Sequence, residues 1–133
     1  MGENELLVCE SRVQAGFSSP AESQIECKLD LNEYLVKHPA ATFFVRAAGD
    51  AMVNVGIHDN DILVVDRSIS VSNNKIVIAA VNGKLMVRRI CMRAAPAASY
   101  LQPENKAYPM IKLDGGLDMC IWGVVTAVIH HPE

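Results

Sequence analysis

The chain has 133 residues, of which 50% are apolar and only 5% are aromatic, and its formal net charge is −3. This length is enough for one domain with its own core, and the dominance of Val, Ile, Leu and Ala among the apolar residues favours a β-rich core. Acidic and basic residues are mixed along the chain. The sequence has no basic stripe of the kind that neutralises phosphates, so direct binding to duplex DNA is disfavoured.

Cysteine usage and the chain's apolar stretches indicate a cytoplasmic protein without a membrane partner. The cysteines are widely separated and none is at a metal-ligand spacing, which is typical of reduced thiols: Cys9, Cys27, Cys91 and Cys120. Glu3 and Glu5 stand where a signal peptide would have a basic head. The apolar stretch 119–129 is far shorter than the roughly 20 residues that cross a bilayer.

The first 29 residues are predicted to form an N-terminal arm, because serine, proline and glycine interrupt any apolar period. Asp30 then suits a helix N-cap, and Glu33 follows at the spacing of a capping box. We expect a short helix over 31–37, which ends at His38 because the residue before a proline avoids the helical region.

The remaining segments predict strands. Asn82-Gly83 lies between two β-branched runs and is a strong hairpin signal, since both residues tolerate positive φ. The predicted strands are 42–47, 62–65, 75–81, 84–90, 110–113 and 120–129. We therefore expect a mainly β fold over residues 30–133, strongly bent or barrel-like, with one short helix and an extended arm at 1–29.

Three blocks of sequence carry the functional signal. The first is Ala48-Gly49-Asp50-Ala51-Met52, followed by a Gly-Ile pair and an acidic turn before the strand at 62–65. The second is the hairpin with Val87-Arg88 on its second strand, and the third is Ala15-Gly16 in the arm. Ala51 and Arg88 are 37 positions apart (88 − 51).

These blocks, in this order and spacing, resemble the LexA/UmuD family of self-cleaving SOS proteins. The resemblance implies that position 51 is the place of a serine nucleophile, position 88 that of a lysine general base, and Ala15-Gly16 that of the cleavage site. Only 15 residues precede the predicted cut, too few for the helix-turn-helix domain of a LexA-like repressor. The chain is therefore expected to be more similar to UmuD than to LexA.

The two catalytic positions lack the groups that Ser-Lys proteolysis needs. The reaction requires a hydroxyl and an amine whose pKa burial has lowered. Ala51 has no nucleophilic atom, and a guanidinium such as that of Arg88 stays protonated, with a pKa above roughly 12. We predict that the chain does not cut itself. Rescue by Ser68, Ser70 or Ser72 is disfavoured, because these residues suit loop capping.

Two origins fit this double departure: a Ser→Ala trap made by design, or a natural homologue that lost cleavage and kept binding.

The other residues of the first motif have structural interpretations. Gly49 is expected to allow a strained turn, Asp50 to cap or be solvated, and Met52 to pack beneath the site. His58, His130 and His131 have no metal spacing, so we expect surface residues, with no metal and no cofactor.

The resemblance implies an accessory subunit of an error-prone Y-family DNA polymerase in the SOS response to DNA damage. It also implies a homodimer and contact with the recombinase–single-stranded DNA filament. The alternative is a non-proteolytic interaction protein that dimerises with an active paralogue and titrates it. Restoring Ser at Ala51 and Lys at Arg88 tests whether the rest of the proteolytic site is whole.

Overall fold

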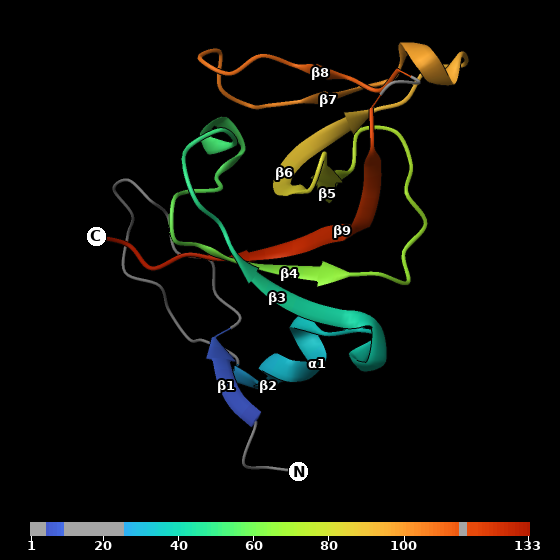
Figure 1. Ribbon diagram of the computed structural model, residues 1–133. Coiled ribbons are helices and arrows are strands. Elements are labelled where there is room, and N and C mark those ends of the chain that lie inside the picture. Colours follow the sequence, from blue (N-terminus) through green and yellow to red (C-terminus); the bar gives the residue numbers. More distant parts are fainter. Residues whose placement is uncertain (1–4, 10–25, 115–116) are drawn as a thin grey trace. The chain divides into compact units, whose positions relative to one another are not determined.

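The structure is a computed structural model, and residues 5–9, 26–114 and 117–133 are described here. The chain divides into two compact units, an N-terminal unit (Met1–Lys37) and a C-terminal unit (His38–Glu133). Figure 1 traces their elements along the chain. The division falls after the first helix, so this helix belongs to the N-terminal unit.

The N-terminal unit contains strands that the sequence analysis did not predict. β1 (Glu5–Cys9) pairs antiparallel with β2 (Glu26–Asp30), within the segment that we expected to be an arm. The short apolar run in β1 does not alternate with polar residues, and its partner strand lies far along the chain. A local apolar period therefore could not reveal β1, whereas Glu26-Cys27-Lys28-Leu29-Asp30 alternates polar and apolar residues, a strand signal that the prediction of an arm missed.

The only α-helix among the described residues, α1 (Leu31–Leu35), begins where it was predicted. The Asp30 carboxylate accepts hydrogen bonds from the backbone amides of Asn32 (3.0 Å) and Glu33 (3.4 Å), which confirms the N-cap. The helix ends at Leu35, two residues earlier than expected, because Val36 already adopts an extended conformation. Within the described part of the chain, no helix has the length and apolar character needed to cross a membrane.

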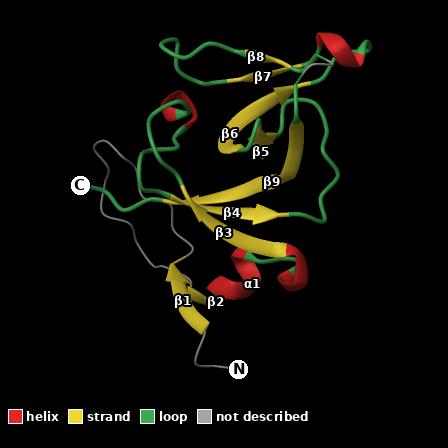
Figure 2. Ribbon diagram, in the orientation of Figure 1, coloured by secondary structure: helices red, strands yellow, loops and turns green. Residues whose placement is uncertain are grey.

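The C-terminal unit is built on one seven-stranded antiparallel sheet in the order β3-β4-β9-β5-β6-β7-β8. Figure 2 shows that its helical segments are single short turns between strands. The strands are β3 (Thr42–Arg46), β4 (Ile62–Asp66), β5 (Ile76–Val81), β6 (Lys84–Cys91), β7 (Tyr100–Gln102), β8 (Ile111–Lys112) and β9 (Met119–Ile129). The mainly β fold is thus confirmed, and only the three-residue β7 was not predicted in this unit.

The longest strand of the sheet, β9, has two different partners along its length. Its first half pairs with β5 and its second half with β4, and the register shifts in both pairings. Such irregularities bend a strand and increase its twist, and β9 is visibly curved in Figure 1. Two apolar clusters draw on alternate residues of the same strands: the one around Met52 and Leu63 includes Ile78 of β5, and the one around Val77 and Leu101 includes Val124 of β9.

The predicted hairpin joins β5 and β6. Asn82 and Gly83 have φ values of 50° and 83°, and Val81 pairs with Lys84 across this two-residue turn. Positive φ at both central residues matches the right-handed twist of the flanking strands. The turn thereby sets the register that pairs Arg88 with Val77.

A buried carboxylate ends β4. Asp66 is 3% exposed and accepts hydrogen bonds from His38 Nδ1 (2.6 Å), the Ser68 amide (2.8 Å) and the Ser68 hydroxyl (2.6 Å). The hydrogen bonds from His38 and Ser68 outweigh the effect of burial and lower the pKa of Asp66 to about 2. Ser68 therefore caps the loop, as expected, and has no role in the cleft described below.

Candidate active-site cleft

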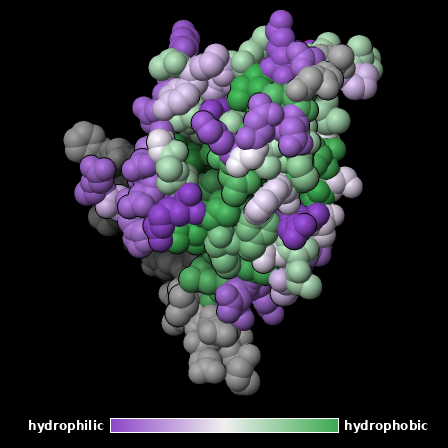
Figure 3. All heavy atoms as spheres, in the orientation of Figure 1, coloured by the Kyte–Doolittle hydropathy of each residue, from purple (hydrophilic) through white to green (hydrophobic). Residues whose placement is uncertain are grey.

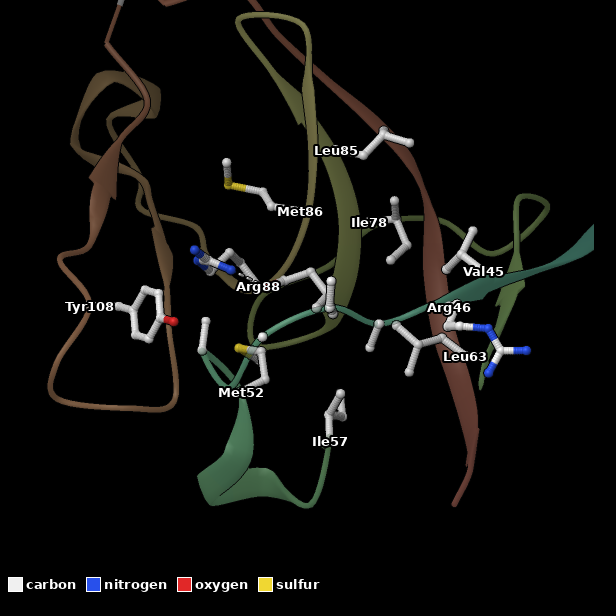
Figure 4. A pocket seen from close by; sticks show the side chains of 15 residues that line it. Val45, Arg46, Met52, Ile57, Leu63, Ile78, Leu85, Met86, Arg88 and Tyr108 are labelled. Atoms are coloured by element: carbon white, nitrogen blue, oxygen red, sulfur yellow. Dashed lines mark hydrogen bonds between the residues drawn. The ribbon is translucent and has the colours of Figure 1, made fainter. Parts of the chain in front are cut away.

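A cleft with a volume of about 320 Å³ lies in the C-terminal unit and contains both positions that the motifs singled out. Ala51 and Arg88 line it together, and Figure 4 shows Arg88 and Tyr108 at one end and Val45 and Arg46 at the other. Apolar side chains form most of the wall: Val45, Ala47, Met52, Ile57, Leu63, Ile78, Leu85, Met86 and Val87. In Figure 3, apolar residues likewise gather over the middle of the visible face, with polar residues around them.

Backbone contacts with the acidic turn hold the loop that carries Ala51. The Ala47 amide donates to the Asp61 carbonyl and the Asn60 amide donates to the Ala47 carbonyl, both at 2.8 Å. The Gly49 amide donates to the Asp59 carboxylate at 2.6 Å, and Gly49 has a φ of 86°. A glycine suits this conformation because a Cβ atom would strain it. The motif and the acidic turn after it thus form one substructure.

The Ala51 side chain lies in a nearly closed environment. Ala51 is 9% exposed, and its neighbour Met52 is 1% exposed and packs in the apolar cluster beneath the cleft, as predicted. The Ala51 carbonyl accepts a hydrogen bond from the Glu104 amide (2.8 Å), and the Glu104 carbonyl accepts one from the Asn54 amide (3.0 Å). The segment between β7 and β8 is therefore fixed against the motif.

The Arg88 guanidinium remains in the cleft. Its Nη1 donates to the Val87 carbonyl at 2.7 Å, while its buried Nε has no hydrogen-bond partner in the structure. Burial lowers the pKa of Arg88, and the nearby Tyr108 partly offsets this effect. The adjacent Arg89 differs, because its Nε donates to the Glu104 carboxylate at 2.7 Å. The charge of Arg88 is thus less well compensated than that of Arg89.

Tyr108 belongs to the cleft but was not predicted from the sequence. Its hydroxyl donates to the Asp50 carboxylate at 2.7 Å, and the Arg88 guanidinium carbon lies 5.8 Å from the centre of its ring. The hydrogen bond and the negative charge of Asp50 raise the pKa of Tyr108. Asp50 therefore anchors this tyrosine instead of being merely solvated. No motif marks position 108, since it lies in a loop whose path depends on β7.

The chemistry available in the cleft is limited. Its described lining contains no serine, threonine or cysteine, and its only hydroxyl is the Tyr108 phenol. A serine-type acyl transfer needs a nucleophile and a base in hydrogen-bonding reach, and the lining offers neither at Ala51 or Arg88. The predicted cleavage residues Ala15 and Gly16 lie outside the described residues.

Outside the cleft, His58 and His130 are exposed, as expected, but both lie beside the buried carboxylate of Asp61. His130 Nδ1 lies 2.5 Å from Asp61 Oδ1, and His58 Nδ1 lies 3.6 Å from Asp61 Oδ2. Burial raises the pKa of Asp61, but the hydrogen bond from the His58 amide and the two imidazoles lower this pKa by more than burial raises it. The pKa of Asp61 is therefore below its usual value. In the described part of the chain, this is the one His, Cys and carboxylate cluster with a metal-ligand arrangement. Sequence spacing could not reveal it, because His130 is remote along the chain.

Comparison with known proteins places the chain in a family. The peptidase S24-like family model matches residues 7–126. Protein MucA of Salmonella typhimurium is 43% identical over 123 residues, which cover 91% of this chain and 82% of MucA. Protein ImpA of Shigella flexneri is 44% identical, covering 90% of this chain and 79% of ImpA, and the LexA repressor of Colwellia psychrerythraea is 33% identical, covering 97% and 60%. The chain therefore belongs to the peptidase S24-like family, the LexA/UmuD family that its motifs predicted.

Proposed function

We propose that this chain is a UmuD-like accessory subunit of an error-prone Y-family DNA polymerase in the SOS response, and that it acts without self-cleavage. The observation that carries the proposal is the combination of Ala51 and Arg88 in one cleft. This cleft is otherwise of the shape and apolar character that suit a peptide segment. The chain is cytoplasmic in this proposal and contacts the recombinase–single-stranded DNA filament.

Three features support the loss of cleavage alongside retention of the fold. Ala51 keeps the buried position and backbone contacts of its motif, but lacks a nucleophilic atom. The guanidinium of Arg88 stays charged and cannot accept a proton from a hydroxyl. The close relationship to MucA and ImpA covers about nine-tenths of the chain, so the binding surfaces of the fold are expected to persist.

The proposal is tested by incubating the purified chain at alkaline pH and, separately, with an activated recombinase–single-stranded DNA filament. We expect intact mass spectrometry to show only the full-length chain in both conditions. A fragment beginning at Gly16 would contradict the proposed inactivity. Failure to bind a purified Y-family polymerase at micromolar concentration would contradict the accessory role.

We further propose that the protein is a homodimer. Several large apolar side chains are strongly exposed in the single chain, among them Phe44 (56%), Leu85 (52%) and Trp122 (44%). Exposed apolar area of this kind is typical of surfaces that another protein covers. We expect the mass of a dimer by light scattering at micromolar concentration, and a monomeric mass under these conditions would contradict this part of the proposal.

A further inference from the structure

The cluster of His58, Asp61 and His130 is produced by backbone pairing. Ile62 pairs with Ile129 at the ends of β4 and β9, so the residues next to this pair, Asp61 and His130, are brought together. His58 lies in the turn before β4, which is closed by hydrogen bonds from the Asp61 amide to the His58 carbonyl (3.1 Å) and from the His58 amide to Asp61 Oδ2 (2.8 Å). The three side chains are therefore held by a turn and a strand pair.

The donor set has the chemistry of a transition-metal site. Two imidazoles and one carboxylate bind divalent zinc, nickel, cobalt or iron, whereas calcium and magnesium prefer oxygen ligands alone. One candidate ligand atom from each of the three residues lies within 4.8 Å of the others. Two donors on a single ion at about 2.1 Å each are at most roughly 4 Å apart. To hold one ion, the widest of these separations must shrink slightly, and His130 Nδ1 and Asp61 Oδ1, which are hydrogen-bonded at 2.5 Å, must move apart to let the ion in.

The site combines one buried, fixed ligand with two exposed ligands that an ion can reach from solvent. The Asp61 side chain is 3% exposed and fixed by the turn, whereas the side chains of His58 and His130 are 46% and 40% exposed. The exposed rings can rotate toward an ion, and water can complete the coordination. Their ring centres are already only 4.5 Å apart. We propose that His58, Asp61 and His130 form a binding site for one divalent transition-metal ion of the zinc class.

A second His–Asp contact in the same unit shows what an ordinary hydrogen-bonded pair looks like here. His38 Nδ1 lies 2.6 Å from Asp66 Oδ2, but Asp66 Oδ1 is occupied by the amide and hydroxyl of Ser68. No second imidazole shares that carboxylate among the described residues. At Asp61, by contrast, two imidazoles lie near one carboxylate: His130 Nδ1 at 2.5 Å, and His58 Nδ1 at 3.6 Å, which is beyond hydrogen-bonding distance.

The site would link the end of β9 to the loop beneath the cleft. The Asp61 carbonyl accepts the Ala47 amide at 2.8 Å, and Ala47 lines the cleft. An ion that binds the folded chain and not the unfolded one stabilises the fold in proportion to the logarithm of its concentration. Addition of Zn²⁺ is therefore expected to raise the Tm of the protein.

The test uses the full chain without a purification tag. Isothermal titration calorimetry with Zn²⁺ is expected to show one ion per chain, and His58→Ala and His130→Ala are each expected to weaken binding at least about tenfold. The double variant should abolish binding, whereas His38→Ala and His131→Ala should leave the affinity unchanged. Circular dichroism and the Tm without metal establish that each variant is folded, and His58→Gln and His130→Gln replace any variant that is not.

Co²⁺ provides a second readout that separates this site from the cysteines. Its visible absorption is expected to show nitrogen and oxygen ligation, without the intense thiolate charge-transfer bands that a cysteine site would produce. Absence of Zn²⁺ binding by the unmodified chain would overturn the proposal. Binding that survives in the folded double variant, or a thiolate spectrum that the variants do not change, would overturn it as well.

Discussion

The double variant Ala51→Ser/Arg88→Lys is expected to cut its own chain between Ala15 and Gly16, while the unmodified chain stays intact. Removal of the nucleophile alone costs on the order of 10⁶ in kcat in a serine hydrolase. The restored pair should therefore change the outcome from no detectable product to a fragment that mass spectrometry assigns to residues 16–133. This is the largest effect that any variant of this chain is expected to produce.

The surroundings of both positions support this expectation. Ala51 is 9% exposed and lines the cleft, so a serine hydroxyl would face the same cavity from a fixed backbone. Burial already lowers the pKa of Arg88, and the same environment would lower that of a lysine by disfavouring its charged form. The cleavage rate should rise with pH until this lysine is neutral, because only the neutral amine accepts the serine proton.

The single variants are the matched controls. Ala51→Ser retains a base position that cannot accept a proton, and Arg88→Lys retains a position without a nucleophile, so neither should cleave. Adding Gly16→Pro to the double variant should block the cut without changing the cleft. A double variant that is folded and dimeric but remains uncut at every alkaline pH would refute the assignment of positions 51 and 88.

Gly123→Ala is expected to destabilise the C-terminal unit by about 1–3 kcal/mol, the usual cost of overpacking a core. A Cβ atom at Gly123 would lie 2.7 Å from Val65 Cγ1 and 3.2 Å from the Asp66 carbonyl oxygen. The clash falls where β9 passes from β5 to β4, so the backbone has little freedom to retreat. Thermal unfolding should show a Tm lower by several degrees, and Gly123→Val should lower it further.

Whether Gly123→Ala lowers or raises the stability is informative, because its effect on the unfolded chain alone would raise the stability. Alanine restricts the unfolded backbone and, where it fits, stabilises a protein by about 0.4–1 kcal/mol relative to glycine. Cys120→Val adds side-chain volume at an exposed position of the same strand and should leave the Tm nearly unchanged. An equal or higher Tm for Gly123→Ala would show that β4 and β9 are less tightly packed than described.

Much of the sheet could be predicted from the sequence because its signals are local. The alternating or β-branched runs located β3, β4, β5, β6 and β9 within one or two residues of their observed ends. The Asn82-Gly83 turn set the register of a whole hairpin. β1 and β7 were missed because what stabilises each is a partner strand that no local period indicates, whereas the polar–apolar alternation of β2 was a signal that the prediction of an arm missed.

The residues of the candidate site likewise fall into two groups: those that the sequence indicates, and those that only the fold brings together. The motif around Ala51 and the hairpin position Arg88 could be found in the sequence, and the structure brings both to one cleft. Tyr108 could not, since it reaches Asp50 through the loop between β7 and β8. The His58–Asp61–His130 cluster also depends on long-range pairing, because the last residues of β9 return to the turn before β4.

The position of β9 also has a consequence for the order in which the protein can be made and folded. This strand is synthesised last of the seven, yet it lies between β4 and β5 and pairs with both. A nascent chain that has not yet released β9 from the ribosome therefore carries the pair β3-β4 and the strands β5-β6-β7-β8, with β4 and β5 each lacking one partner. Non-local pairing of this kind folds slowly and leaves strand edges open to aggregation. The C-terminal unit should thus acquire its stability in a single late step, when β9 pairs with both β4 and β5.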